Sequence, residues 1–331
     1  MEFSSTFAQT MTKLANKSFF ESFDATDTVF QDLFEVKDVS KMGGLSFGQG
    51  TELLGEGEPD QIGYAGDHHM FNISEGFTYF WALKLFQRGF EVNQDMLDNW
   101  KHNPMVGEDY VKTRAKLIGE AMKQFRDKYA AQIFNRGSIA AGDINYFNGT
   151  KPGLQVDTNP GKIYDGQAFF DDAHPLFLDA NTTFDNYTTS LAFSPANLQN
   201  VLTAIRVTNA KDEHNRPIKN DANVVVYNPA LDWTVRTVLE SEKITGSANN
   251  DKNLLKGVIR PVSWHYITDA TAWYTGEAKK GLLFLHKGDP ASSSTVDKMR
   301  GRGIFKWSMT DEFTAVVTQW RHWYAADVAE S

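Results

Sequence analysis

Residues 104–137 place the strongest constraint on what this chain can fold into. Six apolar residues in this stretch recur at alternating spacings of four and three, so they lie along one stripe of a single long helix: Val111, Ala115, Ile118, Met122, Phe125 and Tyr129. Pro104 suits a first helical turn, and Gly137 suits a helix end in the left-handed conformation. About thirty residues at about 1.5 Å each make a rod of roughly 45 Å. Such a rod needs an extended partner surface, although the central helix of an ordinary α+β domain would give the same pattern.

The composition excludes several classes of protein. A chain of 331 residues can bury one large core or two modest ones. Its net charge of -9 and its scattered basic residues disfavour a surface that binds nucleic acid over its whole extent. The absence of cysteine rules out disulfides and thiolate metal sites. The chain has no apolar run of about eighteen residues and no basic-then-apolar N-terminus, so we expect neither a membrane span nor a signal peptide.

Residues 1–74 divide into two parts. Residues 1–40 are polar with scattered phenylalanines and no clean period, which suits either an N-terminal arm that docks on other surfaces or a frayed helical terminus. We interpret residues 41–74 as a long, pliable β-hairpin that protrudes from the body. Glycine at high density weakens strand interiors and permits sharp turns, and this part contains eight: Gly43, Gly44, Gly48, Gly50, Gly55, Gly57, Gly63 and Gly66.

The rest of the chain predicts helices and strands in alternation. Ser194-Pro195 and Asn228-Pro229 each combine a capping residue with a proline that suits the first helical turn. Residues 224–227 are β-branched and predict a buried strand before the second helix. The remaining expectations are a strand over 77–90, a short helix over 93–100, a loop-rich connection over 138–164, strands near 257–262, 271–274, 282–285, 304–307 and 314–324, and an exposed loop over 287–303.

Residues 165–177 form the densest motif, with an Asp-Gly turn, a short strand over 168–170 and an exit through Pro175. Asp171, Asp172 and His174 are residue types that ligate metals. The alternative is a buried turn whose carboxylates and imidazole satisfy local backbone groups. We favour the buried turn, because no second cluster of ligands completes a metal site.

The order of these elements resembles the HK97-type major capsid fold of tailed bacteriophages, and in particular the Mu-like major head subunit group. The resemblance spans roughly residues 75–325, whereas residues 1–70 match only in character. It rests on four segments in order: Tyr164-Asp165-Gly166 through His174-Pro175, Val224 through Leu231, Ile259-Arg260-Pro261, and Ala272-Trp273-Tyr274.

The resemblance implies an α+β capsid fold with an N-terminal arm (1–40), an extended hairpin (41–74), a peripheral domain (75–189 and 301–331) carrying a spine helix at about 105–136, and an axial domain (190–300). It implies a subunit that self-assembles as pentamers and hexamers into an icosahedral shell around double-stranded phage DNA. The implied partners are further copies, a separate scaffolding protein, a portal, a decoration or cement protein, and non-specific contact with packaged DNA. The implied location is the virion capsid, assembled in the host cytoplasm.

Two other functions are considered. An encapsulin-like compartment shell would share the fold and enclose a cargo in place of DNA. A metal-dependent hydrolase would use His68, His69, Asp171, Asp172 and His174. The chain contains no Gly-x-Ser-x-Gly, His-Glu-x-x-His or phosphate-binding glycine motif, while a paired-carboxylate glycosidase stays open because carboxylates are abundant. We therefore predict a non-enzyme with no catalytic, cofactor or metal site.

Overall fold

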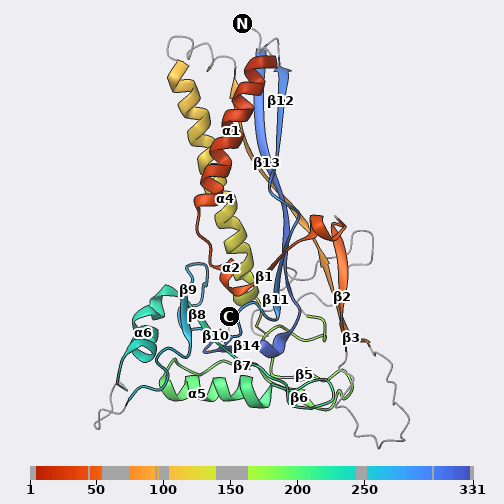
Figure 1. The fold of residues 1–331 in the computed structure, drawn as a ribbon, viewed down its shortest axis with the longest axis vertical. Helices are drawn as coiled ribbons and strands as arrows, with labels where there is room; N and C mark the ends of the chain where they lie inside the picture. The colour runs from red at the N-terminus through yellow and green to blue at the C-terminus, as the bar shows by residue number, and fades with distance from the viewer. Residues whose placement is uncertain are drawn as a thin grey trace, which may run out of the picture.

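The computed structural model describes residues 5–43, 45–53, 75–93, 96, 104–138, 163–243, 252–299 and 302–328. Figure 1 shows an elongated molecule in two parts. The upper part combines two long helices with a sheet that contains the long antiparallel pair β12 (Ala291–Met299) and β13 (Arg302–Val317). The lower part contains a second sheet with shorter helices beside it.

The predicted long helix is present as α4 (Pro104–Asn135). Five of the six stripe residues are buried, and Phe125 remains partly exposed against Phe86 and Phe313. The expected role of Gly137 is wrong, because the helix ends before it without a left-handed glycine. A Cβ on Gly137 would collide with the Ile133 carbonyl oxygen, so this glycine permits a close approach of the backbone.

The N-terminal segment forms a helix, α1 (Ser5–Ala25), that packs along α4 within the same copy. Its buried residues Met11, Ala15, Phe19 and Phe23 follow a spacing of four, which is the periodic signal that the interpretation as an arm overlooked. The two helices approach closely at Gly119, where a Cβ would lie 2.6 Å from the Phe19 carbonyl oxygen. Residues 5–25 therefore form a packed helix, and the role of residues 1–40 as an N-terminal arm stays a prediction.

The first sheet has five strands: β1 (Glu35–Asp38), β11 (Leu282–His286), β13 (Arg302–Val317), β12 (Ala291–Met299) and β4 (Lys84–Asn93). β1 runs parallel to β11, and the other pairs are antiparallel. The exposed loop expected over 287–303 is wrong, because β12 pairs with β13 through most of it. The strand expected at 304–307 is confirmed as part of the longer β13, whereas the strand expected over 314–324 is wrong beyond residue 317, where β13 ends.

The second sheet also has five strands: β7 (Tyr187–Thr188), β14 (Trp323–Ala326), β10 (Trp273–Gly276), β8 (Val224–Tyr227) and β9 (Arg260–Ser263). The alternating residues of β8 point into two different cores, one shared with α4 and the other with α5 and α6. Such a strand is apolar on both faces, which is why its boundaries were predicted correctly.

The two predicted capped helices are confirmed. Ser194 accepts a hydrogen bond from the Asn197 backbone and begins α5 (Pro195–Thr203), which continues as a π-helical turn (Ala204–Thr208). Asn228 accepts from the Ala230 backbone and begins a 3-10 turn (Pro229–Leu231) followed by α6 (Asp232–Glu240).

Sheet membership divides the chain differently from the domains expected from the sequence. β11 and β12 fall within the expected axial range of 190–300 but pair in the first sheet, and β14 falls within the expected peripheral range but pairs in the second. The strand expected over 77–90 is interrupted at Leu83 between β3 (Glu75–Ala82) and β4. The strand expected over 168–170 is reduced to one isolated bridge between Ser138 and Phe170. The helix expected over 93–100 lies almost wholly outside the described residues.

The remaining described elements are short: α2 (Phe30–Leu33), a 3-10 turn (Val39–Met42), β2 (Phe47–Leu53), β5 (His174–Pro175), β6 (Thr183–Phe184) and a 3-10 turn (Trp320–His322). Asp127 of α4 joins three parts of the molecule, because it accepts from the Val29 and Phe30 backbones and from Trp264 Nε1. Its carboxylate thereby attaches the start of α2 and the segment after β9 to the long helix.

The chain passes from the first sheet to the second through the turn at Trp320–His322. Arg321 is buried there and donates to the Glu213 carboxylate at 2.6 Å. His322 Nδ1 lies 3.0 Å from Asn220 Oδ1, and Asn220 Nδ2 donates to the Arg321 carbonyl oxygen at 2.6 Å. Because the Asn220 oxygen must be the acceptor, His322 carries its proton on Nδ1.

We expect His322 to make the folded subunit less stable in mild acid. Burial is the main cause that lowers the pKa of His322 from 6.5 to about 4, against the opposing charge of Glu277. The unfolded imidazole binds a proton near its ordinary pKa, so this contribution to stability is complete above that pH and is lost as the pH falls to about 4. The full shift corresponds to about 3 kcal/mol.

The measurement is the free energy of unfolding in urea between pH 7 and pH 4, compared with that of His322→Asn. The asparagine amide keeps a donor near the position of Nδ1 but does not titrate. We therefore expect the stability of the variant to depend less on pH over this range than that of the natural chain. The same pH dependence in both proteins would contradict the assignment.

Candidate assembly surfaces

The predicted hairpin is confirmed over its stem, where β2 pairs with β3 in antiparallel register. Figure 1 shows the stem standing at the side of the body. Residues 54–74, which complete the expected hairpin, lie outside the described residues. Because side chains alternate along each strand, the β2–β3 register determines which residues lie on each of the two faces of the stem.

Glycines let aromatic rings lie directly on the backbone of β2. A Cβ on Gly48 would lie 2.5 Å from the ring of Trp81, and a Cβ on Gly50 would collide with the ring of Tyr79. Trp81 in turn packs on the cluster of Val39, Leu283 and Leu285 from the first sheet. These glycines therefore attach the stem to the body, whereas the sequence suggested that they make it pliable.

The opposite face of the stem exposes apolar side chains. Phe47 lies opposite Ala82, and Phe80 lies opposite Gln49, so both phenylalanines share this face. Phe47 is 37% exposed and Phe80 is 49% exposed. Paired exposed aromatic rings on a protruding ribbon are typical of a surface that packs against another chain.

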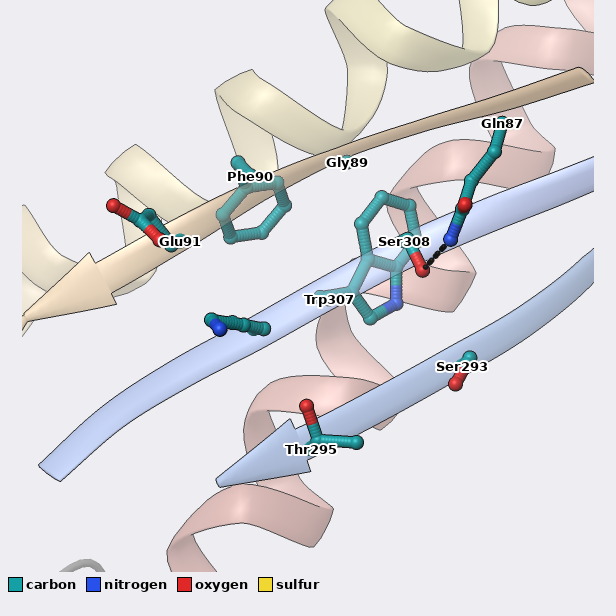
Figure 2. A pocket seen from close by; sticks show the side chains of 9 residues that line it. Gln87, Gly89, Phe90, Glu91, Ser293, Thr295, Trp307 and Ser308 are labelled. Carbon is teal, nitrogen blue, oxygen red and sulfur yellow. Dashed lines mark hydrogen bonds between the residues drawn. The ribbon is translucent and has the colours of Figure 1, made fainter. Parts of the chain in front are cut away.

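A shallow groove of about 510 Å³ lies on the outer face of β4, β13 and β12 (Figure 2). Gly89 lines this groove, and a Cβ there would collide with the Trp307 carbonyl oxygen, so the close approach of β4 to β13 requires glycine at this position. Helices α1 and α4 lie behind these strands in Figure 2, and Trp307 Nε1 donates to Asn16 of α1 at 2.9 Å.

Most residues that line this groove are small or polar, apart from Phe90 and Trp307, and Gln87 Nε2 donates to Ser308 Oγ at 2.9 Å. Its two charged lining residues are Glu91 and Lys306, and Lys306 pairs with Asp297 at 2.6 Å. An open groove with one carboxylate suits contact with a flat partner better than acid–base catalysis, which needs positioned acid and base groups.

The motif at 165–177 is a turn that hydrogen bonds from buried side chains hold in place. His174 lies between Asp165, at 2.7 Å from Nδ1, and Asn186, at 3.1 Å from Nε2, and it stacks on Trp320. Asn186 Nδ2 donates to the carbonyl oxygens of Phe169 and Trp323, so its oxygen is the group that faces the histidine. Both imidazole nitrogens are therefore occupied within the protein.

The predicted turn is buried at Asp171 and His174, but the imidazole of His174 meets the side chains of Asp165 and Asn186 and not the local backbone groups that we expected. Asp171 accepts from the backbones of Ala168 and Ala173, while Asp172 is exposed. Within the described residues, no group of three or more His, Asp or Glu side chains is arranged to hold a metal ion. His68 and His69 lie outside those residues. Sequence reasoning missed Asp165 and Asn186 as the partners of His174, because no local pattern links residues that meet only across the turn.

Among the helices that the structure describes, none is long and apolar enough to cross a membrane.

The described surfaces offer a ribbon with exposed aromatic rings, a flat sheet face and a long helical rod. Together they define a structural subunit whose exposed surfaces suit packing against other chains.

Comparison with known proteins agrees with this class. A family model described as phage capsid protein matches residues 81–330, and the chain belongs to that family. No curated protein matches the chain.

Solved structures are similar to this chain at low identity. The capsid of the cyanophage P-SCSP1u is 12% identical with a TM-score of 0.51, covering 92% of this chain and 89% of that chain. A virus-like particle from Pyrococcus furiosus is 8% identical with a TM-score of 0.49, covering 95% and 98%. A structure from Mycobacterium phage Che8 is 13% identical with a TM-score of 0.47, covering 92% of each chain.

The predicted HK97-type capsid fold and the predicted function as a capsid shell protein are confirmed. Membership of the Mu-like group stays a prediction.

Proposed function

We propose that the chain assembles as pentamers and hexamers into an icosahedral shell that encloses double-stranded phage DNA. The observation that carries this proposal is the family match over residues 81–330, within which lie α4, the second sheet and the strands of the first sheet other than β1. Such shells close because one chain offers different contact surfaces that many copies use in turn. Many modest contacts then make the closed shell far more stable than any single interface.

In this proposal the part built on α4 and the first sheet is the peripheral domain, and the part built on the second sheet with α5 and α6 is the axial domain. The β2–β3 hairpin lies across a neighbouring copy through the face that carries Phe47 and Phe80. The proposed partners are a separate scaffolding protein, a portal, a decoration or cement protein and, without sequence preference, the packaged DNA. Assembly takes place in the host cytoplasm, and the chain has no enzymatic role.

Sedimentation velocity of the purified, untagged chain tests this proposal across protein concentration, salt and crowding agent, with electron microscopy of any fast fraction. We expect discrete pentamers and hexamers, or hollow particles of uniform diameter. Mass spectrometry of the particles should find this chain without a bound protein cargo, which separates the capsid from a compartment shell. A monomer under every condition, also when scaffolding protein from the same phage is added, would contradict the proposal.

A further inference from the structure

One flank of the lower part is acidic. Residues 163–205 contain no lysine or arginine and five aspartates, of which Asp172, Asp179 and Asp185 are exposed. The same flank exposes two apolar side chains next to each other between β5 and β6, Phe177 at 43% and Leu178 at 50%. We call these five residues the acidic flank.

The acidic flank is held in a defined shape. The Phe177 backbone donates to the buried Glu213 carboxylate, and the Asn186 backbone beside Asp185 donates to the Asp171 carbonyl oxygen. Asp179 accepts from Thr182 Oγ1 at 2.6 Å and from the Asn181 backbone, and these hydrogen bonds lower its pKa. The Asp179 carboxylate therefore stays charged in mild acid.

The other flank, on and after α6, exposes cations and large apolar side chains. Trp233 is 83% exposed and Leu254 is 76% exposed, the highest values among the large apolar residues of the described chain. The same part of the chain also exposes Lys243, Lys252, Lys256 and Val258. We call these six residues the basic flank.

The basic flank is also held in place. Lys243 and Lys252 are joined by a β-bridge, and Asn253 Nδ2 donates to the Val238 carbonyl oxygen at 2.6 Å and to that of Ser241 at 3.0 Å. Lys256 has a carboxylate within reach, Glu242 at 3.5 Å, and both side chains are well exposed. Within the described residues, the structure shows no ion pair for Lys243 or Lys252. Glu240 and Glu242 are also exposed here, so among the described residues 232–243 and 252–258 four cations stand against three carboxylates, an excess of one positive charge.

The two flanks lie at opposite ends of the lower part, with α6 at one end and β5–β6 at the other (Figure 1). Two different, complementary surfaces at opposite ends of one subunit allow a head-to-tail contact, which closes a ring when the rotation between neighbouring copies closes. Exposed tryptophan and leucine side chains are uncommon on a surface that stays in water. Opposite charges around them orient the encounter and disfavour other partners.

We propose that the basic flank of one copy packs against the acidic flank of the next copy, and that this contact closes the five-membered and six-membered rings. The inference rests on the proposed function and assigns one of its interfaces to named residues. Trp233 and Leu254 supply the apolar centre of the contact together with Phe177 and Leu178. Lysines and aspartates surround that centre, so the strength of the contact should fall as salt increases.

Charge reversal tests the contact. One variant carries Lys252→Glu and Lys256→Glu, so both of its flanks are acidic. A second carries Asp172→Lys and Asp185→Lys, so both of its flanks are basic. We expect each to raise the concentration needed for half-assembly at least about tenfold, because like charges meet across the interface. A chain that carries all four substitutions should assemble again. Lys13→Glu with Lys17→Glu on α1 is the charge-matched control. It should assemble like the natural chain, and adding it to Asp172→Lys and Asp185→Lys should not restore the assembly that those two substitutions weaken.

A mixture of the two variants gives a sharper result. Chains with two acidic flanks and chains with two basic flanks must alternate around a ring, and only a ring with an even number of members can alternate. The mixture should therefore form hexamers but not pentamers, and it should give sheets or tubes in place of closed shells. The contact is also measurable in dilute solution, where the mixture should sediment as a complex while each variant alone is monomeric.

The outcomes separate this inference from the proposed function. Normal assembly of both variants, or no rescue by the four-fold combination and no complex in the mixture, would overturn the flank contact while shells of the natural chain still supported the function. A natural chain that never assembles would count against the function, and the mixture would still report on the contact. Trp233→Ala should weaken assembly without changing the urea midpoint of the subunit, since its side chain lies in water before assembly.

Discussion

Asp311→Ala should destabilise the unassembled subunit by about 3–5 kcal/mol, because it leaves a buried guanidinium without its partner. Arg126 of α4 donates to the Asp311 carboxylate of β13 through two nitrogens, at 2.7 Å and 2.6 Å. The side chains are 7% and 2% exposed, and the guanidinium also lies over the rings of Phe23 and Phe313. This pair therefore ties the long helix to the long strand at a place that water does not reach.

The measurement is the free energy of unfolding in urea. Asp297→Ala is the matched control, because its pair with Lys306 has the same 2.6 Å separation but both side chains are about half exposed. That substitution should cost only about 0–1 kcal/mol. Replacing both buried partners, as Arg126→Met with Asp311→Leu, should restore much of the lost stability, since no uncompensated charge remains. Equal losses for Asp311→Ala and Asp297→Ala would contradict the importance of burial.

Replacing residues 54–74 by an Asn-Gly turn is expected to abolish shells while leaving the subunit folded. Leu53 and Glu75 are cross-strand partners in the stem, so a two-residue turn can join them without disturbing the register. The stem keeps its attachment through Trp81, so the urea midpoint should stay close to that of the natural chain. The loss of assembly would come from removal of the contact with the neighbouring copy.

Sedimentation velocity and electron microscopy measure this result, with circular dichroism as the test of folding. A Gly/Ser segment of the original length in place of residues 54–74 is the control that separates chain length from side-chain contacts, and it too should fail to form shells. Closed particles of normal diameter from the shortened chain would show that the hairpin has no part in assembly.

The sequence predicted correctly those elements that are stabilised by residues close together in the chain. Five of the six stripe residues from Val111 to Tyr129 are buried as expected, because helical spacing alone places those side chains on one face. The caps at Ser194 and Asn228 are present, because each side chain reaches a backbone N–H within three residues. β8 was placed correctly, because a strand buried on both faces is apolar throughout.

The elements that were missed depend on partners far away in the chain. β12 contains small polar residues such as Ser293 and Thr295, and it is a strand because β13 supplies its hydrogen bonds. Gly48 and Gly50 looked like hinges, but their role comes from aromatic rings of a strand about thirty residues later. The sequence favoured a buried turn at His174 over a metal site, but it did not identify Asp165 and Asn186 as the partners of the imidazole.

The sequence also did not show which strand belongs to which sheet, because the pairing partners are distant in the chain. β11 and β14 are both short and fully or largely buried, and their patterns do not differ in a way that tells which sheet each joins. β14 joins β10 because the turn at Trp320–His322 turns the chain, and that turn is stabilised by Glu213, more than one hundred residues earlier.

The sequence by itself determined the long helix, the capped helices, the hairpin stem and the α+β class, because propensity, capping and hydrophobic period act over a few residues. Only the tertiary structure decided which strands pair, why the glycines are needed and where opposite charges face outward at the two ends of the lower part. Those features depend on surfaces that meet only when distant segments pack, and a linear pattern carries no record of which segments those are.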